Sequence, residues 1–195
     1  MRRSRAALLG AAVALVTEQG TAAIPLSDIA EAADVSRQLI YQQFGDRDTL
    51  LLEAALDLAQ RELLPRVAEA PPGSTGRDRA LAMAQYFADY RAFYQAMLTG
   101  SCAFALNKAL TGLIMPLNRR VVQRIYGERL EEDMVEGVAM FLTGGAAAIF
   151  NAWVVEGEDP LDPEEFTDRY MRMVSVVTDA MRQSTAVTRG KEQGQ

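Results

Sequence analysis

One face of a predicted short helix at residues 37–44 carries side chains that can hydrogen-bond to the edges of DNA bases. Arg37 can bridge the O6 and N7 acceptors of guanine, and Gln38 and Gln42 can each pair with N6 and N7 of adenine. Tyr41, on the flank, can contact a phosphate through its hydroxyl. Together these residue types offer base reading in a major groove, which requires a helix held at a fixed angle.

The residues before this helix predict a second short helix and a tight turn. Its buried face is formed by apolar residues at helical spacing, namely Leu26, Ile29, Ala30 and Ala33. Asp34 stands where the chain must turn, because Asp tolerates the left-handed backbone conformation. Ser36 is a suitable N-cap, and Val35 and Ile40 flank it as a hydrophobic staple. Phe44 points inward with Ile40, which completes the pattern of a helix-turn-helix.

An ordinary helical hairpin with a solvated polar face would show the same short pattern, so its surroundings decide between the two. A preceding amphipathic helix is predicted over residues 5–19 and ends before Gly20. Its inward residues are Leu8, Ala11, Ala12, Leu15 and Val16. The next helix opens after Asp46, which places Arg47 beside a helix N-terminus where phosphate binds well. This context favours the DNA-binding module.

The same region contains three longer patterns. They are Ala-Ala-x-x-Leu-Val-x-x-x-Gly at 11–20, Asp-Ile-Ala-Glu-Ala-Ala-x-Val-Ser at 28–36 and Ile-Tyr-x-x-Phe-Gly-x-Arg-Asp-x-Leu-Leu at 40–51. Over about the first fifty residues the chain thus resembles the N-terminal domain of the TetR family of bacterial transcriptional regulators. The resemblance implies that the residues touching DNA are Arg37, Gln38, Leu39, Tyr41, Gln42, Gln43 and Arg47.

The chain departs from the family pattern at three places. The turn position usually held by Gly is Asp34, and the usual Ser or Thr cap of the first motif helix is replaced by Ile24-Pro25. Ser27 is therefore the expected source of the hydroxyl contact to phosphate, and it joins the predicted DNA-binding residues. Arg47 stands where the family usually has Lys and should keep the phosphate contact.

The predicted fold class is all-α, with an N-terminal three-helix helix-turn-helix module and a larger C-terminal helical domain for dimerisation and ligand binding. The expected domains are residues 1–47 and 48–195. Beyond the module, helices are expected at 47–66 (with Pro65 kinking or ending it), 78–98, 102–113, 116–126, 131–156 and 163–183, with a linker at 71–76, a stop at Gly127 and a frayed tail at 185–195.

The charge distribution fits a small DNA-binding module attached to an acidic body. The chain carries a net charge of −6, whereas residues 1–47 hold five basic and five acidic residues and are neutral. Residues 48–195 therefore carry the whole excess. DNA binding is expected to rely on a few well-placed contacts, with a modest salt dependence.

Composition excludes several classes of enzyme. The chain has no histidine, so it offers no Ser-His-Asp or Cys-His arrangement and no histidine-based zinc site. Acidic clusters at 131–133 and 159–165 could be read as catalytic carboxylates, but both stand where helices should begin, and capping is the preferred interpretation. The sequence predicts no metal, no cofactor and no enzymatic activity, with a helical enzyme as a remote alternative.

The single cysteine, Cys102, cannot form an intrachain disulfide, and its apolar surroundings favour a buried small side chain over a redox sensor. No segment is expected to be long and apolar enough to span a membrane, and the N-terminus lacks a signal-peptide pattern. The prediction is a cytoplasmic protein with no membrane partner.

The predicted helix at 131–156 is apolar on two sides. One stripe contains Met134, Val138, Phe141, Gly145, Ala148 and Ala152; the other contains Val135, Ala139, Leu142, Ala146, Ile149 and Trp153. Such a helix is buried on both faces, so a symmetric four-helix homodimer is preferred over a purely intramolecular core. The predicted interface is Phe141, Gly145, Ala148, Ala152, Phe166, Tyr170, Met173 and Val177.

A ligand pocket is implied mainly by the family resemblance. Its candidate residues, each of which would also suit an ordinary core, are Tyr86, Tyr90, Phe93, Tyr94, Met97, Asn107, Phe150 and Asn151. Asp89 would favour a cationic ligand if it faced inward.

The expected function is a homodimeric repressor that binds a palindromic operator in double-stranded DNA and is released by a small apolar or amphipathic effector. An effector-independent regulator or an activator is the alternative.

Overall fold

The computed structural model describes residues 2–68, 75–126 and 130–192, and in these ranges the regular structure is entirely helical, which confirms the all-α prediction. The helices are α1 (Arg2–Gln19), α2 (Leu26–Ala32), α3 (Arg37–Phe44), α4 (Arg47–Leu58), the π-helix η1 (Ala59–Leu63), α5 (Leu64–Ala68), α6 (Gly76–Asp89), α7 (Arg91–Thr99), α8 (Ala103–Tyr126), α9 (Glu132–Glu156) and α10 (Pro163–Glu192). The expected linker at 71–76 lies mostly outside the described residues, and Gly127 wholly so.

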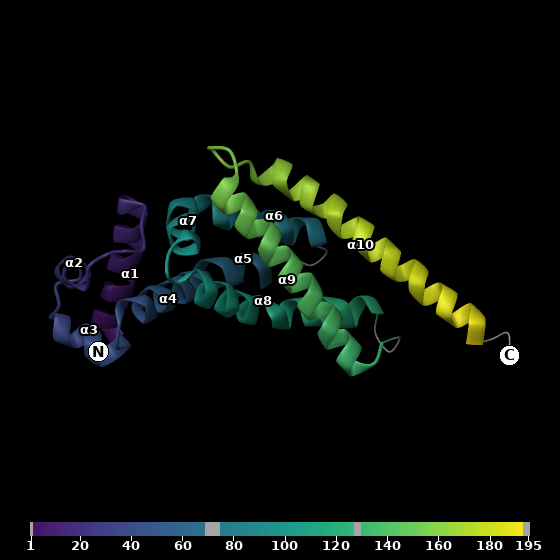
Figure 1. The fold of residues 1–195 in the computed structure, drawn as a ribbon, viewed down its shortest axis with the longest axis horizontal. Coiled ribbons are helices and arrows are strands. Elements are labelled where there is room, and N and C mark those ends of the chain that lie inside the picture. Colours follow the sequence, from purple (N-terminus) through teal and green to yellow (C-terminus); the bar gives the residue numbers. More distant parts are fainter. Residues whose placement is uncertain (1, 69–74, 127–129, 193–195) are drawn as a thin grey trace.

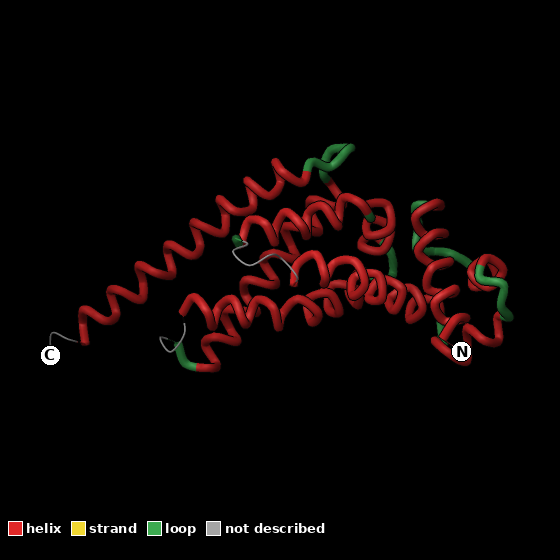
Figure 2. The backbone as a smooth tube through the Cα atoms, turned by 180° about the vertical axis from the view of Figure 1, so that it is seen from behind, coloured by secondary structure: helices red, strands yellow, loops and turns green. Residues whose placement is uncertain are grey.

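The first three helices form a small group at one end of an elongated molecule, and the C-terminal end of α10 lies at the other (Figure 1). The view from behind shows the same separation (Figure 2). Helix α1 packs on α2, α4 and α7. The small group thus contacts α4 and α7 of the remaining chain, which we call the body (the helices from Arg47 onward). One hydrophobic cluster runs from Leu8 in α1 through Leu51 in α4 to Phe166 in α10.

The helix after the motif is longer and less regular than a simple α-helix. It passes from α4 through η1 into α5, where the Leu64 N–H bonds to the Ala59 carbonyl, five residues back. Pro65 lies in the first turn of α5 and does not end the helix. A proline there removes one backbone donor, which the wider π-type turn before it accommodates.

Three predicted helix boundaries are wrong. The helix expected at 78–98 is divided at Tyr90 into α6 and α7, because the aromatic side chains on both sides of the break pack on each other. The helices expected at 102–113 and 116–126 are one helix, α8, with Pro116 inside it. Extensive packing of α8 along α9 outweighs the hydrogen bond lost at the proline. The last helix continues to Glu192, into the expected tail.

The two stripes of α9 have different environments. The stripe that contains Val135, Ala139 and Trp153 is buried against the rest of the chain, whereas Phe141 on the other stripe is 66% exposed.

Helix α9 is also long and apolar enough to cross a membrane, so the expectation that no segment has this length and composition is wrong. Core helices can share both properties, and α9 packs against α6, α7 and α8.

Candidate nucleic-acid interface and cavity

The turn between α2 and α3 has the predicted geometry. Asp34 adopts a left-handed conformation with φ of +52°, and the next amide, that of Val35, donates to the carbonyl of Ala30 at 3.0 Å. The Ser36 hydroxyl accepts a hydrogen bond from the Leu39 amide at 3.3 Å, which confirms Ser36 as the N-cap of α3. The turn is therefore fixed by local backbone and side-chain hydrogen bonds.

Packing fixes which face of α3 points outward. Ile40 is fully buried and Phe44 is nearly so, as predicted from their spacing. The opposite face is open, with Arg37, Gln38 and Gln42 exposed to solvent. Tyr41 is 51% exposed, Leu39 and Gln43 are half-buried, and the Oε1 atom of Gln43 has no hydrogen-bond partner among the described residues. Six of the predicted contact residues thus share one short helix.

Two further predicted contacts lie on the neighbouring helices. Arg47 is the first residue of α4, and its Nε atom donates to the Asp48 carboxylate at 2.9 Å. Asp46 caps α4 by accepting from the Thr49 amide at 2.7 Å. In α2, Pro25 is the N-cap without a side-chain hydrogen bond, and the exposed Ser27 hydroxyl donates to Asp28. Arg47 and Ser27 therefore lie at helix N-termini, where amide groups and the helix dipole favour phosphate.

Helix α1 supports this surface through a residue that sequence analysis did not single out. The guanidinium of Arg5 lies 5.0 Å from the ring centre of Phe44 and also pairs with Glu53 of α4. Arg5 thus connects α1, the end of α3 and α4. Its distance in sequence from both partners explains why no local pattern identified it.

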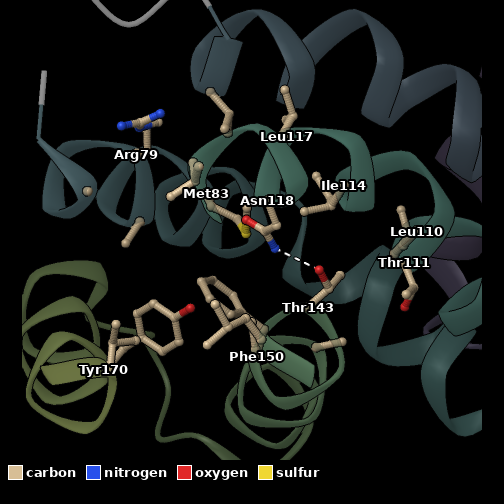
Figure 3. A pocket seen from close by; sticks show the side chains of 18 of the residues that line it. Arg79, Met83, Leu110, Thr111, Ile114, Leu117, Asn118, Thr143, Phe150 and Tyr170 are labelled. Atoms are coloured by element: carbon tan, nitrogen blue, oxygen red, sulfur yellow. Dashed lines mark hydrogen bonds between the residues drawn. The ribbon is translucent and has the colours of Figure 1, made fainter. Parts of the chain in front are cut away.

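A second feature is a cavity of about 360 Å³ between α6, α8, α9 and α10. Most of its wall is apolar, with Met83 from α6 opposite Ile114 and Leu117 from α8 and Phe150 from α9 (Figure 3). Asn118 donates to the Thr143 hydroxyl at 2.8 Å, and Asn151 donates to Asn107. The size and lining suit a small amphipathic molecule.

The structure brings three of the eight predicted ligand residues to this wall, namely Asn107, Phe150 and Asn151. The other five, Tyr86, Tyr90, Phe93, Tyr94 and Met97, lie elsewhere. Four of these are fully buried in the core, where the hydroxyls of Tyr86 and Tyr94 bond to each other at 2.5 Å. Burial raises the pKa of both phenols. Asp89 pairs with Arg66 at 2.7 Å and is not part of the cavity wall.

The cavity residues that sequence analysis missed come largely from α8. Leu110, Ile114, Leu117 and Val121 recur at intervals of three and four residues, a signal that division of this segment at Pro116 obscured. Tyr170, predicted for the dimer interface, also lines the cavity.

The other predicted interface residues fall into two environments. Phe141, Gly145, Ala148, Ala152 and Met173 are exposed in the single chain, and Val177 is half-buried. Phe166 is only 3% exposed because it stacks on Trp153, with ring centres 4.1 Å apart. A Cβ added at Gly144 or Gly145 would meet no atom of the chain within 4 Å.

Comparison with known proteins links these features to a family. Residues 8–54 match the profile of bacterial regulatory proteins of the TetR family. The chain is 29% identical over 150 residues to the HTH-type transcriptional regulator AlkX of Mycobacterium tuberculosis, a match that covers 77% of this chain but only 64% of that protein.

Two solved structures share the fold. A TetR-family regulator from Rhodococcus sp. matches with a TM-score of 0.64 and 20% identity, covering 91% of this chain and 99% of the other. The TetR-family repressor AlkX from Dietzia sp., implicated in biodegradation of n-alkanes, matches with a TM-score of 0.56 and 20% identity over 90% and 95% of the two chains. At this level of identity the likeness concerns the fold.

Proposed function

The chain belongs to the TetR family of bacterial transcriptional regulators, and on this basis we propose that it is a homodimeric repressor released from DNA by a small effector. The observation that carries the proposal is the exposed polar face of α3, presented by a capped turn and a buried Ile40. We propose that Arg37, Gln38 and Gln42 read base edges there, with Leu39, Tyr41 and Gln43 beside them.

Phosphate contacts would hold this helix in register. We propose Arg47 and Ser27 for this purpose, because both lie at helix N-termini. Contacts of this kind set orientation and affinity without reading sequence. The acidic body and neutral module imply that few such contacts exist.

A dimer would place two recognition helices in successive major grooves, about 34–36 Å apart, on a palindromic operator. The exposed stripe of α9 supports such an interface, because Phe141 offers an apolar anchor and Gly144 and Gly145 allow a second helix to approach closely. Exposed side chains of α10, such as Met173, extend the same proposal. We also propose that the protein acts in the cytoplasm, where bacterial DNA is transcribed.

Effector release follows from linkage between the cavity and the module. A ligand that prefers the conformation in which the two modules are wrongly spaced lowers DNA affinity by the ratio of its affinities for the two conformations. The continuous helical segment from α4 to α5 has its first residue, Arg47, beside the motif and Val67 at the cavity. We therefore propose that this segment transmits the conformational change from the cavity to the DNA-binding module.

The direct test is selection of bound fragments from randomised duplex DNA, followed by sequencing. An enriched palindrome with two half-sites is the expected result, and the Arg37→Ala variant should lose enrichment at the guanine it contacts. A single unpaired half-site would contradict the dimeric mode. Absence of enrichment by a folded protein at low salt would contradict sequence-specific DNA binding altogether.

A further inference from the structure

The charged residues of the cavity wall are all of one sign. Among the described residues, the lining contains Arg79 from α6 and Arg120 and Arg124 from α8, and it contains no aspartate, glutamate or lysine. This is unexpected in a chain with a net charge of −6. Low-dielectric walls lined by one sign of charge concentrate ligands of the opposite sign.

Beyond Arg47, five other described arginines of the body form ion pairs, whereas the exposed Arg169 and Arg172 do not. Arg66 and Arg77 each form ion pairs with carboxylates, and Arg119 pairs with two, Glu132 and Glu136. Within the part of the chain that the structure describes, the cavity arginines form no ion pair. Among the described residues, therefore, no carboxylate competes with a ligand for their guanidinium donors.

Arg120 and Arg124 lie one turn apart on α8, beyond Leu117, and Arg79 lies on α6. In Figure 3, Arg79 lies on the side opposite Leu110 and Thr111, and Leu117 lies between them. Helix α8 thus runs from Leu110 toward the side of Arg79, and Arg120 and Arg124 follow in its next two turns. About 13 residues separate Asn107 from Arg120, a rise of about 20 Å along the helix. Along α8, the wall therefore runs from a neutral end at Asn107 to a cationic end at Arg120 and Arg124.

The asparagine side chains of the wall and the Thr143 hydroxyl have protein partners. Asn118 bonds to Thr143, whose hydroxyl in turn donates to the Ala139 carbonyl at 2.7 Å. Asn151 bonds to Asn107 at the neutral end. An apolar body can lie against such a wall without leaving these groups unpaired.

We propose that the effector is an anionic amphiphile, with a carboxylate or phosphate head group held by Arg79, Arg120 and Arg124 and an apolar body lying between α6, α8 and α9. Guanidinium groups match the geometry of both head groups and bind them through paired hydrogen bonds. The inference rests on the proposed effector function and specifies its ligand class. An inward Asp89 would have favoured a cationic ligand. Asp89 lies outside the cavity wall, so the inference replaces the cation with an anion.

The test compares ligands with the same ten-carbon body and different heads by titration calorimetry. The probes are decanoate, decyl phosphate, decanol and decyltrimethylammonium, each below its aggregation concentration. At least one anion should bind ten times more tightly than the alcohol and the cation, and added salt should reduce this preference. Comparison of the two anions then identifies the preferred head group.

Variants separate charge from cavity shape. The double variant Arg120→Gln/Arg124→Gln should remove most of the anion's advantage over decanol, whereas Arg172→Gln, at an exposed arginine outside the cavity, should keep the preference. Ala147→Phe should block the cavity for every probe, with Ala105→Phe as the exposed control. Circular dichroism and thermal melting verify that each variant is folded.

Equal binding of all four probes, abolished by Ala147→Phe, would overturn the anionic inference and leave the effector cavity intact. Failure of every probe to bind a protein that still recognises its selected operator would overturn the ligand class and remove support for effector release, while the DNA-binding function would stand.

Discussion

Ser101 donates a hydrogen bond to Asp48, with 2.8 Å between its Oγ atom and Oδ2, and so joins the corner between α7 and α8 to the first turn of α4. The other carboxylate oxygen, Oδ1, accepts from Arg47 at 2.9 Å. One carboxylate therefore holds both a residue of the body and an arginine beside the recognition helix. A shift of the corner between α7 and α8 would therefore displace Arg47, the residue proposed to contact phosphate.

The first prediction concerns this link. Ser101→Ala should lower the free energy of unfolding by about 0.5–1.5 kcal/mol, the typical net value of one hydrogen bond. It should also weaken operator binding without changing base preference, because Arg47 is less firmly placed. Urea unfolding and operator titration at fixed salt measure the two effects. Ser101→Thr keeps the hydroxyl and serves as the control, and a changed base preference would contradict the assignment.

The second prediction separates base reading from phosphate binding. Arg37→Ala should cost about 1–3 kcal/mol at the cognate operator and less at altered sites, if a guanine contact is lost. Arg47→Gln should weaken binding to all sequences alike and reduce the salt slope by about 1. Competition titrations against a panel of single-base operator variants measure both. Equal discrimination before and after the Arg37 change would remove that residue from the reading face.

The third prediction uses the cap of α4. Backbone and side-chain hydrogen bonds from Thr49 hold the pKa of Asp46 below its ordinary value of 3.8. The folded state thus favours the charged carboxylate, so this stabilisation is present at neutral pH and is lost as the pH falls through the lowered pKa. Asp46→Ala should cost about 0.5–2 kcal/mol at pH 7.

The difference between Asp46→Ala and the parent chain should narrow as the pH falls below about 4. Urea unfolding at a series of pH values measures it. Glu18→Ala, at an exposed position, is the control for general charge effects. A difference that stays constant down to low pH would show that the carboxylate charge is not what stabilises the helix.

The fourth prediction tests the dimer. Gly145→Leu adds a side chain where the single chain has open space, so the fold of each protomer should be unaffected. At a close helix contact the added atoms would collide with the partner, and the protein should shift to monomers in light scattering coupled to size-exclusion chromatography. Phe104→Leu, at a residue 83% exposed on α8, is the control. A dimer unchanged by Gly145→Leu would place the interface elsewhere.

Features set by neighbours in sequence were predictable from the sequence. The conformation of Asp34, the Ser36 cap and the start of α10 at Pro163 all depend on residues within four positions. Asp162, for example, accepts hydrogen bonds from the amides of Glu164 and Glu165, as expected of a helix-starting carboxylate. Such hydrogen bonds form wherever the local chain permits them.

Features set by distant packing were not predictable in the same way. The break at Tyr90 depends on rings from α6 and α7 that pack together, and the continuity of α8 through Pro116 depends on α9. The cavity wall likewise combines residues from Val67 to Val174. Aromatic content alone indicated Tyr86 and Tyr94 for the ligand, whereas the space for one lies where smaller residues face each other.

The shared hydrophobic core has a consequence for how the protein unfolds. Leu8 and Ile40 of the motif region belong to the same cluster as Leu50 and Leu51 of α4, and that cluster extends to Phe166. The predicted boundary at residue 47 therefore does not divide this cluster. A fragment that stops there would expose apolar surface that α4 normally covers, so the recognition helix and the cavity should melt together in one cooperative transition.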